Sequence, residues 1–526
     1  MTSLLANIDP AFKTLAPRAA DWLSILPEIA VAGLALLCLL QALLLPPAQR
    51  WLQPATARVG LLLVLVMSLT SGTAWNLPHG AENFPASFFT GADGLPAFRG
   101  LLRVQLENSE AVRLVFLACA LGTSLLAGRF LRDRGVSVAD YHHVLLIVTA
   151  AFMLLARANH FVVFFMALET AAVGLYVLVG NLRRSAASLE AGVKYLVAGG
   201  LSSALLLMGI VLIYGSLATP TNDSLGFADI AAALQAAQGN FNPLTLVGVA
   251  LVFAGAAFKL GAFPFHTWIP DVYQGAPTPT TALLATASKA AGALALFVLV
   301  TGPFAALGAK LGPLLAGLAI LTLLAGNLAA LAATDVKRTL ALSGVAHAGF
   351  LLAAIAVAVI APNVHFETIG GLAISAEHAI YFYLYAYILG TFLTSAALVS
   401  LPVAEDHDRP LLGLRGLLRR SPVLASALGF GIGSLAGIPP SVGFVAKLII
   451  LGLLVKAKLW WVLGAALLGV AISIHYYFSI LREAVVRPTE DQEELAPLEL
   501  PFGTRFLVGA LTAASILGGL FVLFGG

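Results

Sequence analysis

Charged residues are scarce in this chain, and cysteine is almost missing. Only 10% of the 526 residues are Asp, Glu, Lys or Arg, and the net charge is +3. The two cysteines, Cys38 and Cys119, lie in separate apolar stretches and form no CxxC pair. These shortages argue against a disulfide framework, a zinc ribbon or a cysteine-ligated iron–sulfur cluster. The few basic residues are scattered, which argues against a nucleic-acid partner.

Familiar catalytic motifs are also missing. No HExxH, GxGxxG, Walker A or GxSxG sequence stands in a usable context. The first residues, MTSLLANIDPAFKTLAPRAADW, are too polar for a cleaved signal peptide, so we expect the first apolar helix to direct insertion. Any redox or phosphate chemistry is therefore expected on other subunits.

Apolar residues dominate what is present. They make up 60% of the chain, against about 45–50% in soluble proteins. Nearly uncharged segments of about 18 residues or more, long enough to span a bilayer as helix, recur throughout. We predict an all-α polytopic membrane protein with about fourteen spans. They are 24–45, 59–76, 111–128, 141–157, 159–180, 190–215, 243–275, 278–302, 311–333, 339–361, 375–400, 421–454, 458–481 and 505–524.

Two of these spans, the seventh and the twelfth, contain proline. Pro264 interrupts the seventh span, and Pro439 and Pro440 interrupt the twelfth. Proline removes a backbone donor and clashes with the preceding turn, so both helices are predicted to break.

The basic residues of the connections indicate an orientation. About sixteen of them fall in joints 1–2, 3–4, 5–6, 9–10, 11–12 and 13–14, against about nine on the opposite side. The positive-inside rule places these joints in the cytoplasm and both termini on the periplasmic side. The alternation favours an even number of spans. The sixteen are Arg50, Arg58, Arg129, Arg132, Arg134, Arg183, Arg184, Lys337, Arg338, Arg409, Arg415, Arg419, Arg420, Arg482, Arg487 and Arg505.

The pattern of titratable groups indicates an internal repeat. Residues 141–302 (spans 4–8) and 311–481 (spans 9–13) each carry such a group in their second, fourth and fifth helices. The fourth helix is the broken one in both blocks, and an odd number of helices per block gives opposite orientations. Around these predicted inverted five-helix repeats lie a polar N-terminal segment (1–23), spans 1–3 (24–128) and span 14 (505–526). The matched pairs are Glu169 with His347, Lys259 with Lys447, and Lys289 with His475.

Charged groups inside the apolar spans are the candidate functional residues. Such groups are costly at bilayer depth and commonly mark ion or proton routes. Glu169 and Lys259 could form a switchable ion pair, in which movement of the lysine releases a proton; the alternative is a static pair that locks two helices. Lys289, near mid-depth, is a candidate relay or else a lysine that snorkels to the interface. Lys447 could be the terminal donor or a helix-end lysine.

Other titratable groups are weaker candidates. Glu190 and Lys194 are spaced i,i+4 and could either join the route or anchor the sixth span at the membrane edge. His347 titrates near neutrality and could pass protons between lysines, as could His266 and His475; a lone histidine can also simply pack. The tyrosines of the eleventh span are expected to pack or to order water.

These residues stand in motifs that resemble a known family. FKLGAFPFHTWIPDVYQGAPTPTTALLATASK, LETAAVGLYVLVGNLRRSAASLEAGVKYLVAGG, TDVKRTLALSGVAHAGFLL and GIPPSVGFVAKL are similar to the antiporter-like subunits of respiratory complex I. Within that family the chain most resembles the N subunit, also called subunit 2. The resemblance covers residues 140–485. It assigns Glu169 and Lys259 to the family's ion pair, Lys289 to its central lysine and Lys447 to the twelfth-helix position, where the M-type subunit has glutamate.

The resemblance also implies a function. It predicts a proton-translocating subunit of a bacterial NADH–quinone oxidoreductase in the inner membrane, carrying no redox centre itself. NADH, FMN, iron–sulfur clusters and quinone are then expected in partner subunits, and neighbouring membrane subunits as partners. Two alternatives stay open. One is a cation/proton antiporter subunit of an Mrp-like or membrane-bound hydrogenase complex, and the other is a membrane scaffold that transports nothing.

Overall fold

Long apolar helices form almost the whole structure, because inside a bilayer only a helix satisfies its backbone hydrogen bonds within one segment. The computed structural model describes residues 19–487 and 502–524, except 47–48, 50–51, 73–95, 99–100, 104–105, 218–224, 402 and 404, and also residues 498 and 500. Thirteen helices in this part are long and apolar enough to cross a membrane. The predicted all-α polytopic fold is confirmed.

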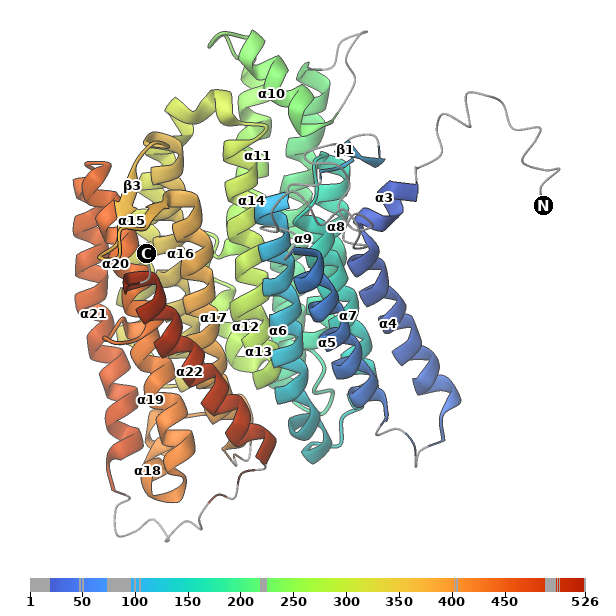
Figure 1. The fold of residues 1–526 in the computed structure, drawn as a ribbon, viewed down its shortest axis with the longest axis vertical. Coiled ribbons are helices and arrows are strands. Elements are labelled where there is room, and N and C mark those ends of the chain that lie inside the picture. The colour runs from blue at the N-terminus through green and yellow to red at the C-terminus, as the bar shows by residue number, and fades with distance from the viewer. Residues whose placement is uncertain are drawn as a thin grey trace, which may run out of the picture.

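The helices follow the predicted order (Figure 1). The unbroken spans are α4 (Leu26–Leu44), α5 (Leu52–Gly72), α6 (Leu106–Asp133), α7 (Val138–Leu155), α8 (Phe161–Val179), α9 (Ala186–Leu217), α15 (Gly308–Leu331), α16 (Val336–Ile360), α17 (Ala376–Ser400), α21 (Trp460–Val485) and α22 (Phe502–Phe524). The broken seventh span is α11 (Pro243–Leu260) with α12 (Ile269–Gly275), and the broken twelfth is α19 (Pro422–Ala436) with α20 (Val442–Lys456). The eighth span consists of α13 (Thr278–Leu283), the π-helical η5 (Leu284–Ser288) and α14 (Lys289–Thr301).

The two breaks have the same local design. Gly261 ends α11 with φ 79° and Gly437 ends α19 with φ 83°, a left-handed conformation that only glycine adopts without strain. Each caps its helix by donating its N–H to two carbonyls of the last turn. A proline follows three residues after Gly261 and after Gly437 alike. The prolines predicted both breaks, which are confirmed, but the glycine caps were missed.

Several boundaries and short elements differ from the sequence prediction. The predicted span 59–76 begins earlier, at Leu52, so Arg58 lies inside a helix rather than in a connection, and its Nη2 donates to the Ser124 carbonyl at 2.9 Å. The short helix α3 (Ala19–Ser24) precedes the first span, and α10 (Phe227–Ala236) follows the sixth. The π-helical turn η5 was also missed.

Hairpins and single turns complete the described fold. The hairpin β3 (His365–Glu367) with β4 (Ala373–Ser375) joins the tenth and eleventh spans, and β1 (Pro96–Ala97) pairs with β2 (Leu102–Arg103) before the third. Both pairs are antiparallel. The remaining short helices are η6 (Ala305–Leu307), η7 (Leu411–Leu414) and α18 (Leu417–Arg420). Most of the predicted polar N-terminal segment, 1–23, lies outside the described residues.

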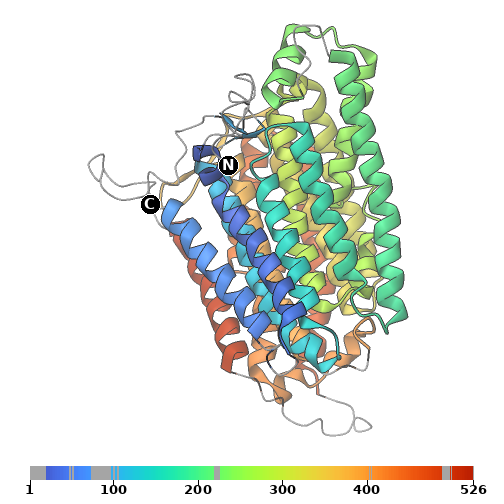
Figure 2. The ribbon, with the colours of Figure 1, turned by 90° about the vertical axis from the view of Figure 1, so that its right-hand side faces the viewer.

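The helices run nearly parallel between two ends of the bundle (Figure 2). α3 and the C-terminal end of α22 lie toward the same end, as an even number of crossings requires, and α18 lies at the other (Figure 1). Burial is uneven across the bundle. The eighth span, Thr278–Thr301, is 94% buried and α16 is 83% buried, against 17% for α22. The centre of the bundle is therefore built from the helices that carry Lys289 and His347.

Close packing of α14 on the end of α11 yields a stability prediction. A Cβ at Gly292 would lie 2.5 Å from the Leu260 backbone nitrogen, which cannot move aside as a side chain can. We expect Gly292→Ala to destabilise the protein by about 1–3 kcal/mol through overpacking. The lowered thermal unfolding temperature of the purified protein measures this. Gly464→Ala is the control, because a Cβ at this helical glycine would have no atom within 4 Å, and its unfolding temperature should change little. Equal stability of the two variants would contradict the prediction.

Candidate functional site

The predicted ion pair between Glu169 and Lys259 is present. Lys259 Nζ lies 3.3 Å from Glu169 Oε1, joining α8 to the end of α11. The Lys259 side chain is 7% exposed and that of Glu169 is 22% exposed. Lys259 stands in the last turn before the break, where the unpaired carbonyls of a helix end favour a cation. Displacing this lysine would therefore change the charge balance beside an irregular stretch of backbone.

Lys289 lies at the centre of the bundle and is fully enclosed. It is 2% exposed, immediately after the π-helical turn η5. Its Nζ donates to the Gly344 carbonyl at 2.8 Å and lies 5.8 Å from the centre of the Tyr387 ring. This depth excludes the alternative in which the side chain snorkels to the interface. An ammonium has three donors, and the described residues accept one of them in a hydrogen bond, which leaves two for water.

His347 connects three aromatic side chains from α17 and α21. Its Nδ1 lies 2.7 Å from the Tyr383 hydroxyl and its Nε2 lies 3.1 Å from the Tyr477 hydroxyl. The Tyr387 ring lies 4.7 Å away, centre to centre, and it is the same ring that faces Lys289. Tyr477 also contacts the Ser343 hydroxyl at 2.5 Å. This cluster of hydroxyl groups and one imidazole can relay protons, and sequence reasoning missed Tyr477 within it.

Lys447 lies at the second helix break. Its Nζ donates to the Leu435 and Ala436 carbonyls at 2.8 and 2.9 Å, the last carbonyls of α19. It also lies 5.5 Å from the centre of the Phe350 ring, which stacks on Tyr383. Lys447 therefore neutralises the carbonyl end of the half-helix α19, while Lys259 stands in the last turn of the corresponding half-helix α11. Its place in the interior, 6% exposed, is not that of an interfacial helix-end lysine.

Lys194 and Glu190 belong to a separate, half-exposed network. Lys194 Nζ lies 2.7 Å from Glu190 Oε1, which confirms the predicted contact, and 2.9 Å from Asp271 Oδ2. Arg338 binds the other oxygen of Asp271 at 2.8 Å. The Lys194 side chain is 46% exposed. The network joins α9, α12 and α16 outside the buried groups, and Asp271 and Arg338 were not anticipated.

Two predicted histidines are not placed with the buried groups. His475 is exposed, whereas its neighbours Tyr476 and Tyr477 face the interior. His475 does lie in α21, the fifth helix of the second predicted repeat, but on its exposed face, and its match with Lys289 stays a prediction. His266 is half-buried between α11 and α12, and its Nδ1 has no hydrogen-bond partner among the described residues.

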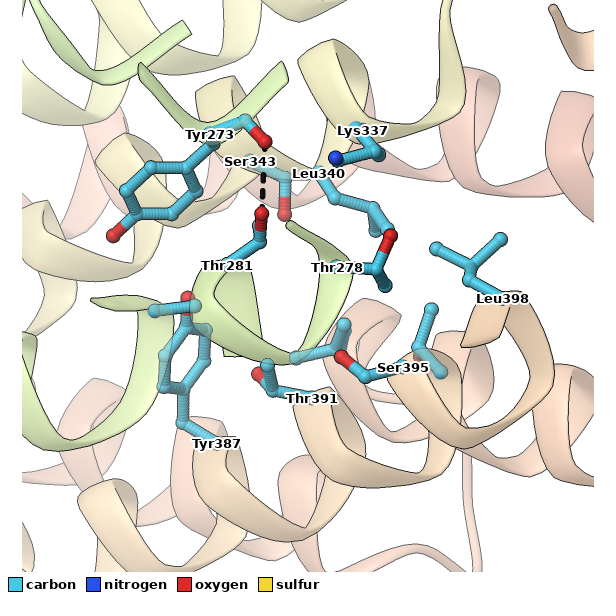
Figure 3. Close-up of a pocket in the computed structure, with 13 residues that line it drawn as sticks. Tyr273, Thr278, Thr281, Lys337, Leu340, Ser343, Tyr387, Thr391, Ser395 and Leu398 are labelled. Carbon is cyan, nitrogen blue, oxygen red and sulfur yellow. Dashed lines mark hydrogen bonds between the residues drawn. The ribbon is translucent and has the colours of Figure 1, made fainter. Parts of the chain in front are cut away.

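A small cavity lies beside the central groups and is lined by hydroxyls (Figure 3). It has about 30 Å³ of room for the centres of water molecules, enough for about two waters. Its lining residues come from α12, α13, η5, α16, α17 and α19. They include Tyr273, Thr278, Thr281, Lys337, Ser343, Tyr387, Thr391 and Ser395. Ser343 and Tyr387 thus connect the cavity to His347 and Lys289.

The described residues contain no group of three or more His, Cys, Asp or Glu side chains that could hold a metal ion. The titratable groups are instead spread along the bundle interior, one or two to a helix. Such an arrangement suits transfer of a small cation in steps rather than binding at one centre.

Comparison with known proteins identifies the family. Residues 158–473 match the profile of the family described as NADH:quinone oxidoreductase/Mrp antiporter, TM. NADH-quinone oxidoreductase subunit N 1 of Opitutus terrae is 42% identical over 511 residues, 95% of each chain. A chain of respiratory complex I from Thermus thermophilus has a TM-score of 0.71 at 30% identity, covering 94% of this chain and 98% of that one.

A more distant structure shares the fold alone. A chain of the Mrp complex from Dietzia sp. has a TM-score of 0.73 at 19% identity, covering 96% of this chain and 98% of that one. The overall fold is thus shared with that chain, while the sequence is more similar to the complex I subunits. The chain belongs to the NADH:quinone oxidoreductase/Mrp antiporter transmembrane family, and within it to the subunit N group.

Proposed function

We propose that this chain is the proton-translocating N subunit of a bacterial NADH–quinone oxidoreductase in the inner membrane. The observation that carries the proposal is the buried sequence of titratable groups from Glu169 and Lys259 through Lys289 and His347 to Lys447. Groups this costly in a membrane interior are commonly retained for transport. NADH oxidation and quinone reduction take place on partner subunits that hold FMN and the iron–sulfur clusters.

The proposed route starts on the face that carries most basic connections, the cytoplasmic face. Protons move toward Lys289, helped by separation of the Glu169–Lys259 pair. They continue through Tyr387, His347 and water to Lys447 and leave on the periplasmic side. The two inverted repeats, 141–302 and 311–481, each contribute one half-helix end that holds a lysine.

The subunits attached to the chain test this function against the Mrp-type alternative. We expect purification from native membranes to recover a complex that oxidises NADH and contains the other membrane subunits of complex I. Recovery of Mrp-type subunits, with sodium transport in the absence of NADH, would instead assign the chain to a cation/proton antiporter. A scaffold that transports nothing predicts that neutralising Lys259, Lys289 and Lys447 has no effect on proton movement.

The Tyr477 hydroxyl is expected to speed proton transfer through His347. Tyr477→Phe removes the group between Ser343 and His347 and keeps the ring, so we expect several-fold slower NADH-driven proton pumping in proteoliposomes. Tyr141→Phe is the matched control, because its buried hydroxyl pairs with Thr280 Oγ1 at 3.1 Å, apart from Ser343, Tyr477 and His347. Equal rates in the two variants would remove Tyr477 from the route.

A further inference from the structure

A buried ionic cluster lies where the loop after α17 meets the start of α13 and α16. Asp406 Oδ1 accepts from Arg409 Nη2 at 2.6 Å and from the Thr278 hydroxyl at 2.8 Å. Asp406 Oδ2 accepts from Lys337 Nζ at 3.2 Å and from the Thr278 backbone N–H at 2.9 Å. The side chains of Lys337, Arg409 and Asp406 are only 1%, 3% and 4% exposed. Lys337 and Arg409 were predicted to lie in connections, and Asp406 was not anticipated.

This cluster separates two spaces. On one side is a surface cleft with about 370 Å³ of room for the centres of water molecules, to which Asp406 itself contributes. On the other side is the small hydroxyl-lined cavity, to which Thr278 and Lys337 contribute (Figure 3). Two of the three hydrogen-bond partners of the Asp406 carboxylate, Thr278 and Lys337, therefore line the inner space, while Asp406 itself lines the outer one.

The outer cleft has the composition of a proton-collecting surface rather than of an anion site. Its lining includes three arginines and three carboxylates, so its formal charge is balanced. The arginines are Arg134, Arg183 and Arg184, and the carboxylates are Asp140, Glu405 and Asp406. All six lie in or next to the connections 3–4, 5–6 and 11–12, on the face predicted to be cytoplasmic.

Attraction between opposite charges keeps Asp406, Lys337 and Arg409 together before a proton is transferred. Burial opposes the charged form of Asp406, but Lys337 and Arg409 keep the pKa of its carboxyl well below the usual range, so it is ionised. Lys337 is further held by the Ala276 carbonyl at 2.6 Å. Two buried cations at this point repel an incoming proton until one of them changes its protonation state or moves.

We propose that Asp406, Lys337 and Arg409 form the gate by which protons pass from the cytoplasmic cleft to the inner cavity; this rests on the proposed pumping function. Lys337 breaks one N–H bond and gives its proton to a cavity water, which forms the O–H bond. The neutral amine no longer holds the Asp406 carboxylate, which takes a proton from a hydronium ion in the cleft, leaving water behind, and passes that proton to Lys337. The cavity water delivers the first proton through Ser343 and Tyr387 toward His347 and Lys289. Arg409 stays charged and holds Asp406 in place.

Asp406→Asn and Lys337→Met test the gate in the whole complex, reconstituted in proteoliposomes with NADH as the electron donor. We expect both variants to slow proton pumping at least tenfold. Glu483→Gln is the matched control, because Glu483 is also a buried carboxylate, 4% exposed, held by Arg415 at 2.8 Å and Arg482 at 2.7 Å. It lines neither the cleft nor the cavity, and should keep more than half of the wild-type rate.

A second readout separates a gate from a structural brace. Ser395→Cys places a thiol in the inner cavity, and the native Cys38 and Cys119 are both buried. We expect neutral methyl methanethiosulfonate to modify this thiol at least fivefold faster when Asp406→Asn is added, because the unpaired Lys337 and Arg409 draw water in. Glu483→Gln should not change the rate. Slow pumping with an unchanged modification rate would overturn the gate, because the cluster would then act only as a brace.

The outcomes distinguish the gate from the function on which it rests. Normal pumping by Asp406→Asn together with inactive Lys289→Arg overturns the gate alone, and normal pumping by both overturns the pumping function as well. If the charge variants do not assemble, Thr278→Val removes one hydroxyl donor from the same carboxylate without leaving a charge unpaired. It should slow pumping and speed modification of the cavity thiol, and wild-type values for both would overturn the gate.

Discussion

Replacing Glu169 by leucine and Lys259 by methionine in one chain is expected to abolish proton pumping while the complex still assembles. The two side chains are paired at 3.3 Å, and losing one partner of a buried pair costs about 3–5 kcal/mol because the other charge is left behind. Removing both charges avoids that cost, and apolar replacements of similar volume are often neutral or stabilising. The double variant therefore removes the proposed switch without removing the packing.

This design discriminates between the two interpretations of the pair. A static lock between α8 and α11 can be replaced by apolar contact, so it predicts near-normal pumping by the double variant. A switch needs a lysine that can leave its carboxylate and release a proton, so it predicts none. NADH-driven acidification of the vesicle interior measures the difference, with subunit content checked on the same sample. Pumping at half the wild-type rate or more would favour the lock.

Replacing Lys289 by arginine is the second variant with a large expected effect. Arginine keeps the positive charge and the Gly344 carbonyl as an acceptor, but its guanidinium does not release a proton at any physiological pH. If Lys289 acts as a relay, Lys289→Arg should abolish pumping just as Lys289→Met does. If the site needs only a fixed charge, arginine should be active and methionine inactive.

Lys310→Met is the matched control for this substitution. Lys310 is an exposed lysine near the start of α15, and its Nζ lies 5.1 Å from the centre of the Phe241 ring. Removing it takes one positive charge from the same chain without touching the interior. We expect less than a twofold change in the NADH-driven pumping rate. A loss as large as that of Lys289→Arg would mean that the assay reports general damage rather than a relay.

Much of the fold could be predicted because long apolar stretches of sequence indicate membrane-spanning helices. The spans, both proline breaks, and the contact of Glu169 with Lys259 follow from hydropathy, from proline chemistry and from the cost of a buried charge. Charged residues in apolar spans are few, so the sequence offers only a few possible ion-pair partners for each one.

Other features could not be predicted because they depend on which helix faces touch. Tyr477 and His475 are two residues apart on one helix, and only packing against α16 decides that the tyrosine faces inward. Asp406 lies in a short polar connection that resembles any solvated loop, and folding buries it against Thr278 and Lys337. The sequence of the π-helical turn η5, LATAS, carries no signal that distinguishes it from ordinary helix. The start of the second span was placed too late because a long polar side chain such as that of Arg58 can lie inside a helix and donate a hydrogen bond to the neighbouring helix.

The number of protons moved for each NADH oxidised is the measurement that tests the central claim most directly. It should be made on sealed proteoliposomes that contain the assembled complex. The wild-type complex and the Lys289→Arg complex are compared at equal protein content. We expect Lys289→Arg to move fewer protons per NADH than the wild type, because the route through this chain needs a lysine that gives up its proton. A ratio equal to that of the wild type would contradict it.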